Sequence, residues 1–229
     1  MNIASSMPWP SLTPLILTLK LGLWTTLLLF ICGVPLAYWL VHGRSFLRLP
    51  CRIMVNLPLV LPPIVLGFYL LLLFSPTGTI GCFLEDYFHI RFAFSFAGLV
   101  LGSMLFSLPF MLNPMMAGLE SLPPSLLEAA YVLGRSRTAT LLRVLLPAIR
   151  PSLLSALMMT FAHTIGEFGL VLMIGGKIEG ITRVASIAVY DEVESFNYRA
   201  AHFYSAILLI VSFLLLYLMF LINRRSRTF

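Results

Sequence analysis

One acidic side chain lies within a long apolar run. Glu167 falls about two-thirds of the way along segment 151–174, and His163 precedes it by four residues, which places both on one face of a helix. A charge in a membrane interior costs about 2.5–3.5 kcal/mol on insertion scales, so Glu167 must face protein or water. Two roles stay open, a gate on a translocation path or a buried acid that pairs with His163 or another span. Gly166 and Gly169 beside it allow another helix to approach closely.

The sequence gives little support for a protease, metal or nucleotide-binding site. Ser103 and His163 are the residue types of an intramembrane protease dyad, but residues 101–104 read Leu-Gly-Ser-Met and lack its Gly-x-Ser-Gly pattern. There is no metal-spaced His/Asp/Glu cluster and no Gly-x-x-x-x-Gly-Lys-Ser/Thr string, so we expect no catalytic residue, metal or cofactor on this chain. The cysteines also lack metal-ligand spacing; they are Cys32, Cys51 and Cys82.

Composition indicates what positions these residues. Hydrophobic residues make up 59% of the chain and charged residues 10%, whereas soluble domains have about 25% charged residues. The sequence therefore predicts an all-α polytopic membrane protein, a single transmembrane domain over residues 1–229. Its basic residues form no continuous patch, which argues against binding to nucleic acid. We expect membrane lipid to surround the chain. Stretches of about 20 apolar residues predict five spans, at 14–41, 53–74, 92–113, 151–174 and 201–222.

The basic residues predict an orientation. Alternate connections hold ten Lys or Arg residues in one set and five in the other, and the richer set belongs on the cytoplasmic side. This predicts an N-out/C-in topology, a cytoplasmic loop at about 115–150 and a periplasmic loop at about 175–200 with a surface helix over 181–193. The richer set comprises Arg44, Arg48, Arg52, Arg135, Arg137, Arg143, Arg150, Arg224, Arg225 and Arg227; the other comprises Lys20, Arg91, Lys177, Arg183 and Arg199.

Prolines interrupt the second predicted span. Pro58, Pro62 and Pro63 free backbone carbonyl groups, and such backbone is tolerated at membrane depth only where protein or a water-filled cavity covers it. Either a kinked helix lines a path, which the nearby Asn56 favours, or the helix bends to pack.

The basic loop after the third span predicts two short helices. Pro123-Pro124 ends the preceding segment, and Ser125 stands three residues before Glu128, which is capping-box spacing. Gly134 suits a left-handed cap residue, a second helix follows over 138–146, and Pro147 stops it. Two amphipathic helices this short are not stable alone, so they must bury their apolar faces against a protein partner or the membrane interface.

This loop resembles a known family. Its spacing matches the EAA loop of binding-protein-dependent ABC importer permeases, with Val144 in place of the usual isoleucine. The resemblance implies a type I permease fold in which this loop lies in a cleft of a separate ATPase and couples hydrolysis to transport. The matching positions are Glu128, Ala129, Ala130, Gly134, Val144, Leu146 and Pro147.

Two further strings narrow the resemblance. Residues 57–74, LPLVLPPIVLGFYLLLLF, and 160–176, TFAHTIGEFGLVLMIGG, are similar to molybdate or tungstate importer permeases; sulfate permeases share mainly the second string. Relatives often have arginine where this chain has His163. The implied gate or path residues are Pro62, Pro63, His163, Gly166, Glu167, Phe168 and Gly169.

The resemblance also implies an assembly. We expect a homodimer in a bacterial inner membrane, two cytoplasmic ATP-binding subunits that use Mg-ATP, and a periplasmic oxyanion-binding protein. Such a complex imports molybdate or tungstate by alternating access, and this chain is not an enzyme by itself. The alternatives are a permease for sulfate, thiosulfate or another oxyanion, or a proton-coupled secondary transporter that uses Glu167. Five spans without an inverted repeat suit the last alternative poorly.

Overall fold

The computed structural model describes residues 10–43, 45–76, 78–88 and 91–226; Arg44 and Arg227 of the topology count lie outside them, and the side chains of Arg224 and Arg225 are not described. Every regular element in this part of the chain is a helix. In order these are α1 (Thr13–His42), α2 (Arg48–Asn56), the 3₁₀ turn η2 (Leu57–Leu59), α3 (Pro63–Phe74), α4 (Thr79–Phe88), α5 (Phe96–Glu120), α6 (Pro124–Val132), α7 (Arg137–Thr140), the π-helical turn η3 (Leu141–Leu145), α8 (Leu146–Ala148), α9 (Arg150–Gly166), α10 (Gly169–Gly175), α11 (Ala185–Glu194) and α12 (Tyr198–Ser226).

Three of the predicted spans are single long helices. α1, α5 and α12 are each long and apolar enough to cross a membrane, and they correspond to the predicted spans 14–41, 92–113 and 201–222. α5 begins at Phe96 because the Ser95 hydroxyl accepts a hydrogen bond from the Gly98 amide at 3.1 Å, as an N-cap residue does. The other two predicted spans are broken, the second between α2 and α3 and the fourth between α9 and α10.

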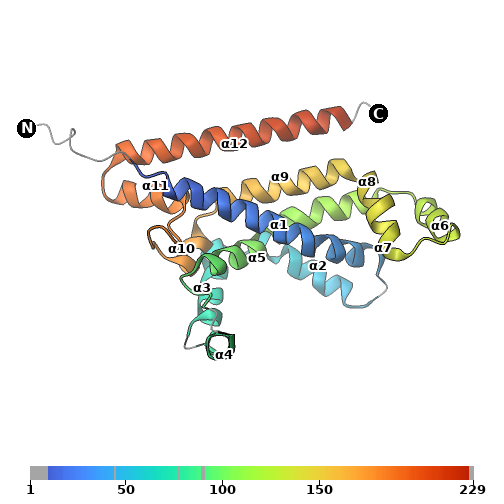
Figure 1. The fold of residues 1–229 in the computed structure, drawn as a ribbon, viewed down its shortest axis with the longest axis horizontal. Coiled ribbons are helices and arrows are strands. Elements are labelled where there is room, and N and C mark those ends of the chain that lie inside the picture. The colour runs from blue at the N-terminus through green and yellow to red at the C-terminus, as the bar shows by residue number, and fades with distance from the viewer. Residues whose placement is uncertain (1–9, 44, 77, 89–90, 227–229) are drawn as a thin grey trace, which may run out of the picture.

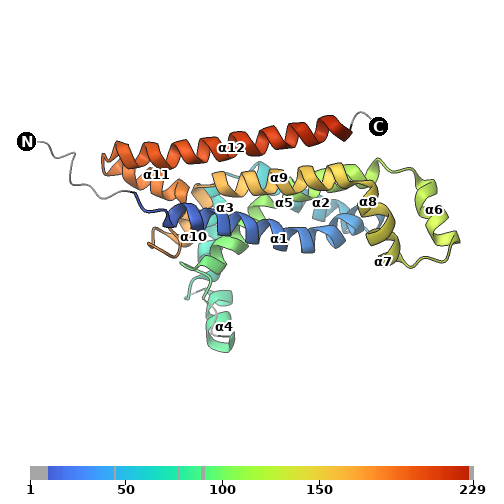
Figure 2. The ribbon, with the colours of Figure 1, turned by 45° about the horizontal axis from the view of Figure 1, so that its top comes forward.

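The spans form a bundle with distinct ends. α1, α5 and α9 pack together, and α12 runs along α9 (Figures 1 and 2). The start of α1 and α11 lie at one end, whereas α6, α7 and the C-terminal end of α12 lie at the other (Figure 1). The 115–150 connection and the C-terminal end of α12 therefore share one end, and the 175–200 connection lies at the other, as the charge count predicted. Which end faces the cytoplasm stays a prediction.

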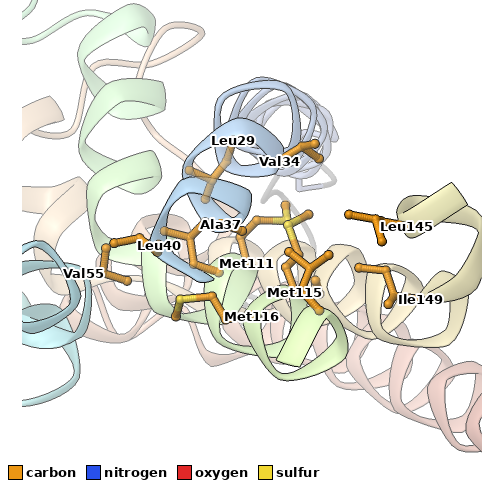
Figure 3. Packing of buried hydrophobic residues seen from close by; sticks show 13 residues of the cluster. Leu29, Val34, Ala37, Leu40, Val55, Met111, Met115, Met116, Leu145 and Ile149 are labelled. Atoms are coloured by element: carbon orange, nitrogen blue, oxygen red, sulfur yellow. The ribbon is translucent and has the colours of Figure 1, made fainter. Parts of the chain in front are cut away.

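Two buried clusters hold the bundle together. The first joins α1, α5 and the start of α9 near the α6–α8 end, where Met111 and Met115 meet Leu29 and Ile149 (Figure 3). The second joins α1, α5 and α10 near the opposite end and includes Leu21, Leu99 and Leu170. Methionine side chains fill irregular gaps between helices, which suits the first cluster.

The second span turns sharply at its prolines. The helices on either side of Leu61-Pro62 are bent by 113°, because Pro62 adopts φ −58° and ψ 136° and Pro63 begins α3. α3 then packs closely on α10. A Cβ atom at Gly67 would lie 2.8 Å from Met173 Cβ and 3.0 Å from Leu170 Cα.

Arg48 joins the end of α1 to α2. Its Nε, Nη1 and Nη2 atoms donate to the carbonyl oxygens of Leu40, Gly43 and Val41 at 2.7, 2.7 and 2.6 Å. The last carbonyl groups of a helix have no partner within the helix, so this side chain satisfies acceptors that would otherwise be open. Arg48 therefore has a structural role beyond its contribution to topology.

Candidate functional site

The predicted helix pair is present, but its first cap differs from the prediction. α6 begins at Pro124, and its N-cap residue is Pro123, which makes no side-chain cap hydrogen bond. Pro124 occupies the first helical position, where a missing amide proton costs nothing. Ser125 thus lies one residue inside the helix, and the predicted Ser125–Glu128 capping box is wrong. Glu128 is exposed on α6.

Gly134 ends the first helix as predicted. Its φ is +72°, in the left-handed region that glycine adopts readily. The Gly134 amide donates to the Tyr131 carbonyl at 2.9 Å, and the Arg135 amide donates to the Ala130 carbonyl at 3.1 Å. This pair of bonds defines a Schellman motif, so a defined turn, rather than a flexible loop, joins the two arms.

The second arm continues past its predicted end. The Ser136 hydroxyl caps α7 by accepting from the Ala139 amide at 3.3 Å. The arm widens into a π-helical turn over Leu141–Leu145 and continues through Pro147 to Ala148, with a bend of 82° before α9. The helix thus ends at Ala148, one residue after Pro147, so the prediction that Pro147 stops it is off by one residue.

The 124–148 hairpin has an apolar tip. Val132 is 85% exposed and Leu133 is 79% exposed, and α6 lies beyond the ends of α1 and α9 in both views (Figures 1 and 2). Ala129 is also exposed, while Ala130 is buried. The remaining family positions, Val144, Leu146 and Pro147, are half-buried at the base. These two neighbouring side chains form a small exposed apolar surface at the tip of the hairpin.

Glu167 lies at the break of the fourth span. α9 ends at Gly166, and Glu167 has extended backbone angles. Its side chain is only 6% exposed, and the Ser103 hydroxyl of α5 donates to Oε2 at 3.4 Å. Oε1 is buried without a hydrogen-bond partner among the described residues. Its backbone carbonyl accepts a 2.6 Å hydrogen bond from Ser186.

His163 does not pair with Glu167. Its Nδ1 lies 2.9 Å from the Ser107 hydroxyl of α5, and its ring stacks on Phe110 with a centroid distance of 4.0 Å. Of the two partners left open for Glu167, the structure has the one on another span, Ser103 of α5. The pairing with His163 is wrong because the helix ends between the two residues. Ser103 was considered above only as a residue of a protease dyad and Ser107 not at all, although their spacing of four within an apolar span places both on one face of a helix. We call Ser103, Ser107, His163 and Glu167 the polar seam.

The two glycines near Glu167 differ. A Cβ atom at Gly169 would lie 3.1 Å from Pro63 Cβ and 3.0 Å from Ile64 Cγ1, so Gly169 permits the close approach of α3 as expected. A Cβ at Gly166 would meet nothing within 4 Å. The prediction of a close contact at Gly166 is therefore not met within this chain.

The other path positions lie at the start of α3 and at the break before α10. Pro62 is exposed and Pro63 half-buried at the start of α3. The ring of Phe168 contacts that of Tyr190 in α11, with centroids 5.1 Å apart. The structure thus brings Glu167 and His163 together only through α5.

The 177–197 connection is held by ion pairs. α11 covers Ala185–Glu194, close to the predicted 181–193, but Ile187 and Ala188 are buried, so it packs on the bundle. Asp191 bridges Lys177 at 2.7 Å and Arg183 at 2.9 Å. A hydrogen bond from Tyr190 and, to a smaller extent, one from Lys177 lower the pKa of the Glu194 carboxyl group. These contacts neutralise the basic residues of this loop.

Solved structures share this fold. A bacterial ABC transporter that imports the polysaccharide alginate has a TM-score of 0.75 at 18% identity, over 99% of this chain and 87% of that chain. The MetNI methionine ABC transporter, in an inward-facing conformation, has a TM-score of 0.73 at 19% identity, over 97% of this chain and 99% of that chain. At these identities the likeness shows the fold, which is that of the type I ABC importer permeases.

Curated relatives are more similar in sequence. The molybdenum transport system permease protein ModB of Azotobacter vinelandii is 42% identical over 89% of this chain and 90% of its own length. A sulfate transport system permease protein, CysT of Escherichia coli, is 32% identical over 81% of this chain and 66% of its own length. The family model for the binding-protein-dependent transport system inner membrane component matches residues 29–228. The chain therefore belongs to this family, the membrane-spanning permease subunits of ABC importers whose ATPase is a separate subunit.

Proposed function

We propose that this chain forms the path through which an ATP-driven importer moves molybdate, or tungstate, from periplasm to cytoplasm. We assign molybdate as the substrate because the chain is 42% identical to a molybdenum permease over nearly the whole of both chains. The sulfate permease is less similar, and this chain matches about two-thirds of its length. Residues 1–229 then act as one transmembrane domain in a bacterial inner membrane, with the N-terminus outside.

The partners follow from the family and from the 124–148 hairpin. Two copies of the chain close one path, two cytoplasmic ATP-binding subunits hydrolyse Mg-ATP, and a periplasmic oxyanion-binding protein delivers the anion. The exposed apolar tip at Val132 and Leu133 supports docking of the hairpin into each ATPase. Closure of the ATPase pair on ATP would move the hairpins and open the outer side.

Glu167 has a packing or gating role in this proposal and is not an anion ligand. Its carboxyl group is buried against Ser103. An ionised carboxylate there would repel a dianion such as molybdate, because like charges in a medium of low dielectric constant interact strongly. We propose that the other path positions also lie beside the path, on the family resemblance alone. They are Pro62, Pro63, His163, Gly166, Phe168 and Gly169.

Anion uptake in a strain that lacks the gene tests the substrate. Cells complemented with the chain should accumulate molybdate and tungstate, and a tenfold excess of sulfate should compete weakly. Uptake of sulfate in preference to molybdate would replace the proposed substrate. Uptake that persists after ATP depletion but stops when the proton gradient collapses would contradict ATP-driven import itself.

A further inference from the structure

A hollow lies between the end of α1 and the 124–148 hairpin. Its volume is about 510 Å³, within the roughly 300–1,000 Å³ typical of small-ligand pockets. Its walls come from two segments almost a hundred residues apart in sequence. They are formed by Tyr38, Trp39, His42 and Gly43 at the end of α1, and by Leu127, Tyr131 and Arg137 of the hairpin.

The polar groups of this lining suit an anion. Arg137 has a permanent positive charge and five N–H donors, and the Trp39 indole nitrogen only donates. None of the seven lining residues is acidic. A pocket with a guanidinium group, hydroxyl groups and no carboxylate attracts oxyanions, since charge-assisted hydrogen bonds to their oxygens are the strong ones.

The hydroxyl groups of Tyr38 and Tyr131 together leave one O–H donor free for a ligand. Their hydroxyl oxygens are 3.2 Å apart, so one phenol donates to the other. Two phenols have two O–H protons, and this contact uses one of them. The remaining proton is available to a ligand in the hollow. The His42 ring, stacked on Tyr38 with centroids 4.8 Å apart, holds that phenol in place.

The location gives the anion a source. α1 is a spanning helix and His42 is its last residue, so the hollow opens at the level of a membrane surface. Tyrosine and tryptophan concentrate at this level, and basic pockets there bind anionic headgroups. Because α1 forms one wall and the hairpin the other, a bound anion would restrain the hairpin against the bundle.

We propose that this hollow binds a tetrahedral oxyanion group, supplied either by the phosphate of an anionic lipid or by a free oxyanion, and that the bound group fixes the hairpin against α1. The inference goes beyond the proposed transport function, because it does not depend on which anion is transported. Its test requires neither the ATPase nor the binding protein.

The test uses the fluorescence of Trp39. Replacing Trp9 and Trp24 with phenylalanine leaves it the single tryptophan of the full-length permease in detergent, since the chain has three. Dihexanoyl phosphatidylglycerol, dihexanoyl phosphatidylcholine and inorganic phosphate are titrated separately. We expect a saturable change in emission with phosphatidylglycerol or with phosphate, and the tighter of the two identifies the source.

Variants separate the site from a general effect of charge. Arg137→Gln should weaken binding about tenfold or more, the effect of losing a charge-assisted hydrogen bond. Arg135→Gln is the matched control, because Arg135 is an exposed arginine of the same turn that does not line the hollow. It should bind as the wild type does, with thermal unfolding confirming that both variants fold. Absence of saturation with both anions, equal affinity for phosphatidylcholine, or unchanged binding in Arg137→Gln would overturn the proposal.

Discussion

Replacement of Gly134 by valine should uncouple ATP hydrolysis from transport. A residue with a Cβ atom costs about 1–2 kcal/mol in the left-handed region, and Gly134 has a φ of +72°. An added Cβ would meet nothing within 4 Å, so backbone strain, not collision, sets the cost. If the turn opens to relieve this strain, the two hydrogen bonds that close it are lost as well, each worth about 0.5–1.5 kcal/mol. Gly134→Val should therefore destabilise the hairpin turn by about 1–2 kcal/mol, or raise its opening roughly tenfold.

Two measurements test this reasoning. Hydrogen exchange at the Arg135 amide reports opening of the turn, because that amide donates to Ala130 across it. The ratio of anion uptake to ATP hydrolysis in a reconstituted complex reports coupling. Gly134→Asn is the matched variant, since asparagine visits the left-handed region more readily; it should exchange and couple more nearly as the wild type does. Normal exchange and coupling in the valine variant, or equal damage from asparagine, would refute the argument.

Three further predictions concern other parts of the bundle. Arg48→Met should lower the free energy of unfolding by about 2–3 kcal/mol through its lost hydrogen bonds to α1. Arg91→Met removes an exposed ion pair and should leave the free energy of unfolding almost unchanged; equal losses in thermal unfolding would contradict the structural role of Arg48. Gly67→Ala should lower the free energy of unfolding by about 1–3 kcal/mol, because the added methyl group forces α3 away from α10. Gly166→Ala should lower it clearly less in thermal unfolding; the reverse order would show that α3 and α10 can separate freely. Glu167→Gln should leave the preference for molybdate over sulfate unchanged in competition uptake, and a switched preference would show that the carboxylate contacts the anion.

Hydropathy and a few special residues predicted much of the fold. Segments 92–113 and 201–222 are mainly apolar and contain no Asp, Glu, Lys or Arg, so α5 and α12 followed directly from composition. Gly134 was identified because a glycine between two amphipathic stretches suits a left-handed cap residue. These features depend on residues near in sequence, which is why pattern reasoning found them.

Features that depend on distant contacts escaped prediction. The helix end at Gly166 moved Glu167 off the face of His163, and the partner of each proved to be a serine of α5. Pro124 is the first residue of α6 rather than the residue before it, and Pro147 lies one residue before the end of α8 rather than after it. Local spacing does not determine which of a proline's permitted positions the tertiary structure uses.

The polar seam has a consequence for movement between helices. Ser103 and Ser107 are neutral hydroxyl groups one helical turn apart on α5, and each can donate or accept. Exchanging such a partner costs about 0.5–1.5 kcal/mol, whereas separating a buried ion pair costs about 3–5 kcal/mol. Sliding of α5 against the broken fourth span therefore separates no ion pair among these four residues, and the buried clusters at the two ends of the bundle add to the resistance.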